Sequence, residues 1–299
     1  MTKPYRLGID LGGTKIEAVL LDAAGEMVLR ERVATPPGYR AILSSIQKLS
    51  VLAEQRAGVE LALGVGLPGA ISPRTGLLRN ANTVCLNGRD LLADLQLLTQ
   101  RPVRAQNDAN CFALSEAMDG AAADFNMVFG VIIGTGTGGG LVWNKQLITG
   151  RHAIAGEWGH NPLPWVKPFD IQRDCYCGKQ GCVETFLSGP GLSANVAALT
   201  GKRLSSRQIV AGAERGDADC SEQMDHYYDQ LARALAQVIN IVDPDAIVLG
   251  GGMSNIQRLY SELPRRLGQY VFSDYVDTVF LAPKFGDSSG VRGAAWLWD

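Results

Sequence analysis

Two glycine-rich segments have the composition of phosphate-binding turns. They are Gly12-Gly13-Thr14 and Gly134-Thr135-Gly136-Thr137-Gly138, and each follows an apolar run. Glycines leave backbone N–H groups accessible and threonine hydroxyls add donors, which is what a phosphate chain requires. Each segment could instead be only a tight turn. Because a strand-like run resumes after both, neither opens a helix as dinucleotide-binding and Walker sequences do. A third glycine run adds Gly251 and Gly252 as candidates for contact with a base or ribose.

Several carboxylates stand where they could serve the same chemistry. Asp10 precedes the first glycine turn and could hold Mg²⁺ near phosphates, through water because Mg²⁺ keeps its waters. Asp108 begins a predicted helix, where it is either a helix cap or a general base for a substrate hydroxyl. Glu157 and Glu184 are either solvated glutamates or acceptors for hydroxyl groups. Two asparagines, Asn80 and Asn82, are further candidates for polyol recognition.

Three of the six cysteines lie within eight residues, at Cys175, Cys177 and Cys182, and His160 stands fifteen residues before the first. One imidazole and three thiolates are the ligands of a closed structural zinc site. A redox pair or ordinary cysteines are the alternatives, and His152 is a second nearby histidine. A single site without a basic run argues against a nucleic-acid zinc finger.

The elements that would position these residues occur twice in the same order. Each half has a strand, a glycine turn, a returning pair of strands, helices and a further strand. The first half is predicted to contain strands at 7–11, 16–21, 27–33, 61–67 and 103–105 and helices at 39–56, 90–98 and 108–122. The second is predicted to contain strands at 127–133, 141–143, 146–148, 246–249 and 278–282, helices at 225–242 and 290–298, and loops over 150–191. This indicates a duplicated α/β architecture with ligands at the carboxyl ends of the strands, in a cleft between two halves.

Composition excludes several classes of protein. The 299 residues carry 28 basic and 30 acidic side chains, so a phosphate-rich nucleic acid is not the expected partner. No apolar run is long enough to span a membrane. The sequence enters its first strand after six residues, which leaves no room for a signal peptide, so we expect a reducing cytoplasm and free cysteines.

Six motifs in order resemble the ROK family of sugar kinases over nearly the whole chain. They are Asp10-Leu-Gly-Gly-Thr14-Lys15, Gly66-Leu-Pro-Gly69, Asn107-Asp108-Ala-Asn110, Gly134-Thr-Gly-Thr-Gly138, Glu157-Trp-Gly-His160 and Cys175-Tyr-Cys-Gly-Lys-Gln-Gly-Cys182-Val-Glu184. The resemblance implies an actin-like ATPase fold, which is a duplicated ribonuclease H-like α/β fold with two lobes and a central cleft. One lobe would be 1–118 with the C-terminal helix 287–299. The other would be 119–286, with a zinc-binding insertion at 150–191.

The resemblance also implies roles for residues. Asp108 would be the catalytic base, and ATP and Mg²⁺ would bind at the Asp10 and glycine motifs, including Lys15. Zinc would be held by His160, Cys175, Cys177 and Cys182. The sugar would contact Gly69, Asn82, Asn107, Asp108, Glu157, His160 and Glu184.

The stretch 157–165 resembles bacterial fructokinases with mannokinase side activity, so fructose, phosphorylated on its 6-hydroxyl, is the expected substrate. N-acetylglucosamine, glucose or mannose is the alternative within the family, and a non-catalytic sugar sensor is the alternative outside catalysis. The repressor branch of the family has a helix-turn-helix before the first strand, for which six residues are too few. A homodimer is expected from the family.

Overall fold

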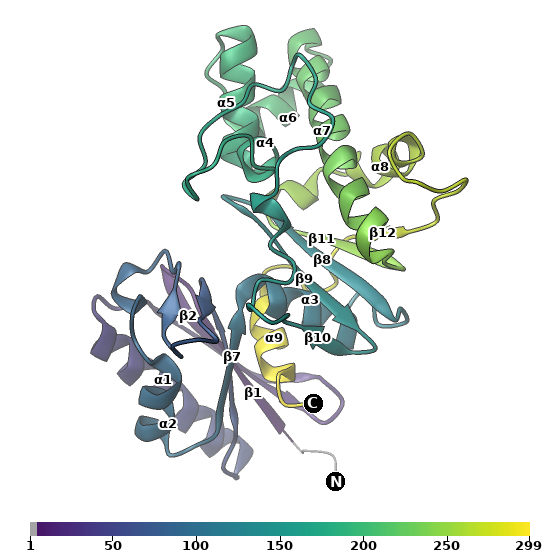
Figure 1. The fold of residues 1–299 in the computed structure, drawn as a ribbon. Coiled ribbons are helices and arrows are strands. Elements are labelled where there is room, and N and C mark those ends of the chain that lie inside the picture. Colours follow the sequence, from purple (N-terminus) through teal and green to yellow (C-terminus); the bar gives the residue numbers. More distant parts are fainter. Residues whose placement is uncertain (1–4) are drawn as a thin grey trace. The chain divides into compact units, whose positions relative to one another are not determined.

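The computed structural model describes residues 5–299 and contains two five-stranded sheets built to one plan (Figure 1). The first has the order β3 (Met27–Ala34), β2 (Lys15–Asp22), β1 (Tyr5–Leu11), β4 (Leu63–Leu67), β7 (Val103–Asn107). The second has the order β10 (Gln146–Ile148), β9 (Thr137–Trp143), β8 (Met127–Ile133), β11 (Ala246–Gly250), β12 (Val279–Leu281). In the first sheet β2 is antiparallel to β1 and β3, whereas β4 is parallel to β1 and β7. In the second, β9 is antiparallel to β10 and β11 is parallel to β8 and β12. The matching strand orders confirm the predicted duplication.

Most helices lie where their spacing predicts. Those predicted are α1 (Tyr39–Ala57), α2 (Leu91–Thr99), α3 (Asp108–Met118), α7 (Ala218–Val242) and α9 (Ser289–Trp296). Helix α3 ends before 122 because the Glu116 carboxylate accepts a hydrogen bond from the Ala121 N–H at 2.8 Å. Helix α7 begins seven residues earlier than predicted, where the Asp217 side chain caps it through the Cys220 N–H.

The sequence prediction missed α5 (Gly189–Thr200), α6 (Ser206–Glu214) and α8 (Leu259–Leu267). Helix α5 starts with Gly189 and Pro190, which hide its helical pattern, although Ser188 caps it. Helix α8 contains Pro264. Among the described residues, no helix combines the length and apolar character needed to cross a membrane. The remaining short elements are the strands β5 (Ala70–Ile71) and β6 (Leu78–Arg79), the helix α4 (Glu184–Leu187), and single 3-10 turns.

The chain divides into two compact units. The first comprises the described residues up to 124 together with 140–155 and 284–299, and the second comprises 125–139 and 156–283. In the first unit, α9 brings the end of the chain back onto β1, β4 and α3 (Figure 1). This close packing depends on glycine: a Cβ on Gly293 would lie 1.6 Å from the Cys111 carbonyl oxygen of α3, and one on Gly64 would lie 1.8 Å from the Ala294 carbonyl oxygen.

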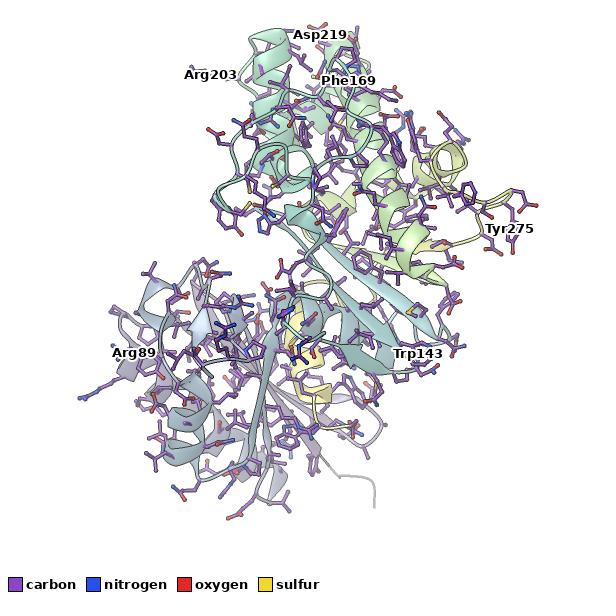
Figure 2. All side chains as sticks on the ribbon, viewed as in Figure 1. Arg89, Trp143, Phe169, Arg203, Asp219 and Tyr275 are labelled. Atoms are coloured by element: carbon purple, nitrogen blue, oxygen red, sulfur yellow. The ribbon has the colours of Figure 1, made fainter. Side chains whose placement is uncertain are left out.

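Some large apolar side chains remain exposed in the second unit. Phe272 and Tyr275 lie on the loop between α8 and β12, and Tyr275 projects outward (Figure 2). Exposed aromatic residues of this kind can bind a second protein surface. The homodimer expected from the sequence nevertheless stays a prediction.

Candidate active site

Two carboxylates lie together at one edge of the first sheet. Asp10 is near the end of β1, and Asp108 is the first residue of α3, directly after β7. Strands β1, β4 and β7 are parallel, so their carboxyl ends meet at this edge. Burial, followed by the charge of Asp108, raises the pKa of Asp10 from its ordinary 3.8 to about 6. A cation placed between the two carboxylates would relieve this cost.

The surroundings of Asp108 fit a group that must accept a proton. Burial raises the pKa of Asp108, while hydrogen bonds from the Ala109 N–H and from Asn107 act in the opposite direction. The residue is nevertheless exposed at the surface, so solvent and substrate can reach it. Its Oδ1 accepts the Ala109 N–H at 2.8 Å, which the Asn107 side chain shares at 2.9 Å. The N-cap of α3 is Asn107, and Asp108 is the first helical residue, which shares the capping hydrogen bond and whose geometry is also compatible with a base.

Asp10→Asn is expected to raise the free energy of unfolding at pH 7 in magnesium-free buffer. The folded protein holds the Asp10 proton to a higher pH than the unfolded chain does, so the stability contributed by this group falls as pH rises from about 4 to about 6. Above that range the folded protein carries the full cost of an ionised Asp10, at most roughly 3 kcal/mol, and asparagine removes this cost. Urea unfolding should show a more stable variant at pH 7 and a smaller difference near pH 4. Equal stabilities at pH 7 would contradict the assignment, and the exposed Asp274→Asn is the matched control.

The other predicted residues of the first unit gather around Asn107 and the first glycine turn. The Asn107 amide donates to the Gly69 carbonyl at 3.1 Å. Gly69 has φ +80°, and a Cβ there would lie 2.3 Å from the Arg79 carbonyl oxygen, so this turn requires glycine. Asn82 lies beside Gly13: a Cβ added to Gly13 would be 3.9 Å from the Asn82 Oδ1. Gly69 and Asn107 therefore lie next to Asp108, and Asn82 lies next to the glycine turn that follows the strand of Asp10.

Two details of the first glycine turn differ from a simple phosphate cradle. The Gly12 N–H donates to the Lys15 carbonyl at 3.0 Å and so closes its own turn. The Lys15 ammonium lies 3.5 Å from the buried Glu17 carboxylate, which also pairs with Arg30 and Arg32. Thr14 and Gly13 are exposed at the tip of the turn. Both residues are therefore accessible to a ligand.

The second glycine turn is tied to Glu184. The Thr137 N–H donates to Glu184 Oε2 at 2.9 Å, and a Cβ on Gly136 would lie 2.7 Å from the same oxygen. The Gly134 N–H closes its own turn on the Gly136 carbonyl at 2.9 Å. Strand β9 begins at Thr137, so Gly138 belongs to the strand rather than to the turn. A carboxylate expected to bind sugar thus also fixes the turn expected to bind phosphate.

A cavity of about 520 Å³ opens beside this turn in the second unit. That volume is typical of small-molecule sites. Three predicted nucleotide residues line it, namely Gly134, Thr135 and Gly252. Gly251 has a packing role instead. Its φ is +81°, and any residue with a Cβ would place that atom 2.4 Å from the Ile133 carbonyl oxygen.

The rest of the cavity wall was not predicted from the sequence. It includes Gly189 and Pro190 at the start of α5, Ser206, Arg207 and Glu214 of α6, and Asn255. The Gly189 N–H donates to the Gly134 carbonyl at 2.8 Å, which holds the start of α5 against the glycine turn. The available signal was Ser188-Gly-Pro-Gly191, a capped helix start rich in glycine.

The four predicted metal ligands form one cluster. The ligand atoms of His160, Cys175, Cys177 and Cys182 all lie within 4.8 Å of one another. The Cys177 and Cys182 sulfurs are 3.6 Å apart, and the Cys175 sulfur is 3.5 Å from His160 Nδ1. Four tetrahedral ligands around an ion with metal–sulfur bonds of about 2.3 Å would be separated by roughly 3.8 Å, so the cluster fits a metal ion. His152, the alternative ligand, is not part of it.

The chain folds tightly around this cluster. The Cys175 N–H donates to the Lys179 carbonyl at 2.7 Å, and Gly178, with φ +85°, allows the hairpin between them. Burial raises the pKa of the Cys182 thiol to about 12, whereas that of exposed Cys177 is lowered by the Lys179 N–H. Metal binding to these sulfurs would release protons, because thiolates are the ligands.

The segment 157–160 is fixed beside the second glycine turn. The Trp158 indole N–H donates to the Gly138 carbonyl at 2.9 Å, and a Cβ on Gly159 would lie 2.0 Å from the Thr137 carbonyl oxygen. Glu157 precedes this 3-10 turn with an exposed side chain, and His160 ends it. The structure therefore brings Glu157, His160 and Glu184 to the same part of the second unit.

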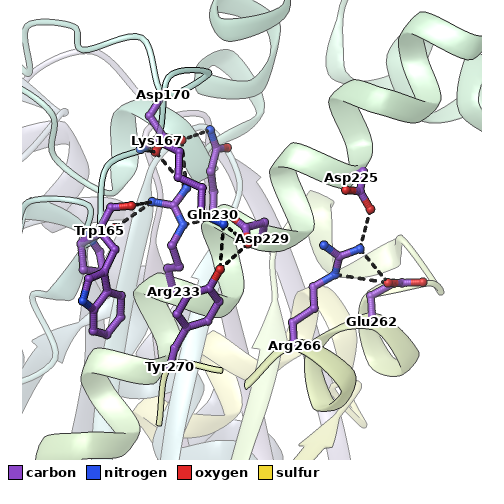
Figure 3. A network of polar contacts seen from close by, with 11 residues as sticks. Trp165, Lys167, Asp170, Asp225, Asp229, Gln230, Arg233, Glu262, Arg266 and Tyr270 are labelled. Atoms are coloured by element: carbon purple, nitrogen blue, oxygen red, sulfur yellow. Dashed lines mark hydrogen bonds and ion pairs between the residues drawn. The ribbon is translucent and has the colours of Figure 1, made fainter. Parts of the chain in front are cut away.

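A buried polar network continues from this segment (Figure 3). The Arg233 guanidinium of α7 is fully buried and donates to Asp170, Asp229 and the carbonyls of Pro164 and Trp165. The Lys167 ammonium and the Tyr270 hydroxyl both donate to Asp229, at 2.9 and 2.6 Å. These donors hold the pKa of Asp229 below its ordinary value despite its burial. The network anchors the loop 164–170 to α7, a few residues beyond His160.

The fold and these clusters define a member of a known class. The model of the ROK family matches residues 6–299, so the chain belongs to the ROK family. Its structure is similar to the ROK hexokinase from Thermus thermophilus, with a TM-score of 0.87, 28% identity and coverage of 98% of this chain and 97% of that one. It is also similar to a ROK family glucokinase from Streptomyces griseus, solved with glucose and AMPPNP, with a TM-score of 0.76, 27% identity and coverage of 97% and 98%. The predicted fold class is therefore confirmed.

The chain is similar in sequence to particular enzymes. It is 40% identical over 296 residues to the N-acetyl-D-glucosamine kinase of Salmonella gallinarum, which covers 97% of this chain and 98% of that protein. The protein of the same name from Salmonella heidelberg matches to the same extent. These relatives are named for the alternative substrate expected from the sequence rather than for fructose.

Proposed function

We propose that this protein is an ATP-dependent sugar kinase that phosphorylates N-acetylglucosamine on its 6-hydroxyl. The observation that carries the proposal is the 40% identity to N-acetyl-D-glucosamine kinases over nearly the full length of both chains. The fructose preference suggested by the stretch 157–165 has no such support. The neighbouring carboxylates Asp10 and Asp108, whose charges interact, would supply the magnesium ligand and the base of such a reaction.

In the proposed reaction, Asp108 accepts the proton of the sugar hydroxyl while the hydroxyl oxygen attacks the γ-phosphorus of ATP. The new O–P bond forms as the bond between the γ-phosphorus and the bridging oxygen breaks, and ADP leaves. Bound Mg²⁺ would neutralise phosphate charge, and Asp10 would hold it through water. Positioning and electrostatic stabilisation carry most of the rate in such transfers.

Residues of the second unit would bind both substrates. We propose that the cavity lined by Gly134, Thr135 and Gly252 takes the nucleoside part of ATP, since its volume suits a small molecule. The sugar hydroxyls would be bound by Glu157, His160 and Glu184. The cluster of one histidine and three cysteines would hold zinc as a structural ion, because all four positions are protein ligands.

A hexose panel tests this function. With ATP and Mg²⁺, we expect kcat/KM for N-acetylglucosamine to exceed those for glucose, mannose and fructose by about tenfold or more, because a site built to hydrogen-bond a polar group of its substrate rejects analogues that lack that group. The measurement is coupled ADP release, with each sugar omitted in turn as the blank. If kcat/KM is highest for fructose, the fructokinase prediction made from the sequence holds instead. If no hexose is turned over, the sugar-sensing alternative is favoured.

A further inference from the structure

Tyr176 occupies an unusual position between two ligands of the metal cluster. It is the middle residue of Cys175-Tyr176-Cys177, and the residue is 81% exposed. Its hydroxyl lies 2.9 Å from His160 Nε2, and the two rings meet edge to face at 87° with centroids 5.1 Å apart. A tyrosine so exposed would ordinarily turn its hydroxyl to water. The contact of the Tyr176 hydroxyl with His160, which is proposed to bind the sugar, therefore needs an explanation.

The chemistry of the imidazole fixes the direction of this hydrogen bond. His160 Nδ1 faces the cluster, 3.5 Å from the Cys175 sulfur. When Nδ1 binds a metal ion, the ring proton resides on Nε2. The Nε2–H group is then the donor and the Tyr176 hydroxyl oxygen is the acceptor. A single N–H group makes one good hydrogen bond, so it cannot serve a sugar oxygen while Tyr176 keeps its place.

Two carboxylates act on the same hydroxyl. The negative charges of Glu184 and Glu157 both reach the Tyr176 hydroxyl. Glu157 and Glu184 are the two proposed acceptors for sugar hydroxyls, so the phenol lies within electrostatic range of the whole proposed sugar-binding set. The position that its oxygen takes on His160 is therefore one where a sugar hydroxyl is expected.

We propose that Tyr176 is a substrate gate, whose hydroxyl oxygen occupies the hydrogen-bonding position on His160 that a sugar hydroxyl takes over on binding. The inference rests on the proposed function, because it assumes that His160 contacts the sugar. In the free protein the phenol satisfies the Nε2–H group and holds the ring in one orientation. The exchange costs little because the ring is exposed and its hydroxyl is hydrated once released. A ligand that offers no hydroxyl oxygen at this position cannot replace it.

Tyr176→Phe tests the gate, because it keeps the ring against His160 and removes only the competing oxygen. The competing hydrogen bond is worth about 0.5–1.5 kcal/mol, so the Kd for N-acetylglucosamine, measured by calorimetry without ATP, should fall roughly 2- to 12-fold. We expect kcat to stay within about twofold, since the hydroxyl takes no part in phosphoryl transfer, and zinc per chain to be unchanged. Tyr275→Phe, which removes an exposed phenol elsewhere in the same unit, should leave the Kd as it is.

An unchanged Kd in Tyr176→Phe would overturn the gate, and so would a higher one, which would mean that the phenol itself holds the sugar. Either result leaves the proposed kinase function intact when the wild-type protein still phosphorylates the sugar. The absence of any sugar binding or turnover by the wild-type protein would instead overturn the proposed function, and the gate with it.

Discussion

Asp108→Asn is expected to lower kcat for sugar phosphorylation by a factor on the order of 10²–10⁴, the range typical of losing a general base. The amide cannot accept the hydroxyl proton at neutral pH, so the attacking oxygen must lose it to water. Asparagine has nearly the same shape, so sugar binding should survive and the loss should appear in kcat rather than in KM. Steady-state ADP release and sugar calorimetry separate these two quantities.

The same substitution also separates the two interpretations of Asp108. Asparagine is as good a helix cap as aspartate, so a residue that only capped α3 would tolerate the change. Asp90→Asn is the matched control, because the Asp90 side chain caps α2 by accepting the Ala93 N–H and has no role in the proposed chemistry. Near-wild-type turnover by Asp108→Asn would exclude Asp108 as the base.

The parts of the site encoded by neighbouring residues could be predicted from the sequence. The glycine turns follow directly from the strands β1 and β8, and the cysteine cluster is formed by a single short hairpin, so spacing alone indicated both. Spacing alone left His160 and His152 open, because both stand near the cysteines in the chain. The family resemblance pointed to His160, and it is His160 that lies in the cluster.

Features that join distant segments could not be predicted in this way. Nothing in the sequence links Thr137 to Glu184. They meet because α4, which begins just after the cysteine cluster, starts beside the first residue of β9. The cavity wall supplied by α6 was missed for the same reason. Motif spacing also failed to indicate the substrate, because recognition of one hexose depends on the placement of a few polar atoms rather than on motifs shared by a whole family.

Arg233 shows this limit most clearly. Its surroundings were not predicted from the sequence: the guanidinium is fully buried and pairs with Asp170, which is buried as well (Figure 3). Removing one partner of a buried ion pair leaves an uncompensated charge, which typically costs about 3–5 kcal/mol. Arg233→Ala should therefore lower the free energy of unfolding by that amount, measured by urea denaturation.

Arg266 provides the matched control, because it also pairs with two carboxylates, those of Asp225 and Glu262, but lies nearer the surface (Figure 3). Ion pairs nearer the surface are weaker, about 0–1 kcal/mol when fully exposed, so Arg266→Ala should cost less than Arg233→Ala. Adding Asp170→Asn to Arg233→Ala should recover part of the loss, because it neutralises the carboxylate that the alanine leaves without its ion-pair partner while keeping its shape.

If Arg233→Ala costs no more than Arg266→Ala, or if Asp170→Asn deepens the loss, the penalty comes from lost packing rather than from a buried charge. The loop 164–170 would then be held by the stacking of Trp165 on Tyr270 instead of by the Arg233 network.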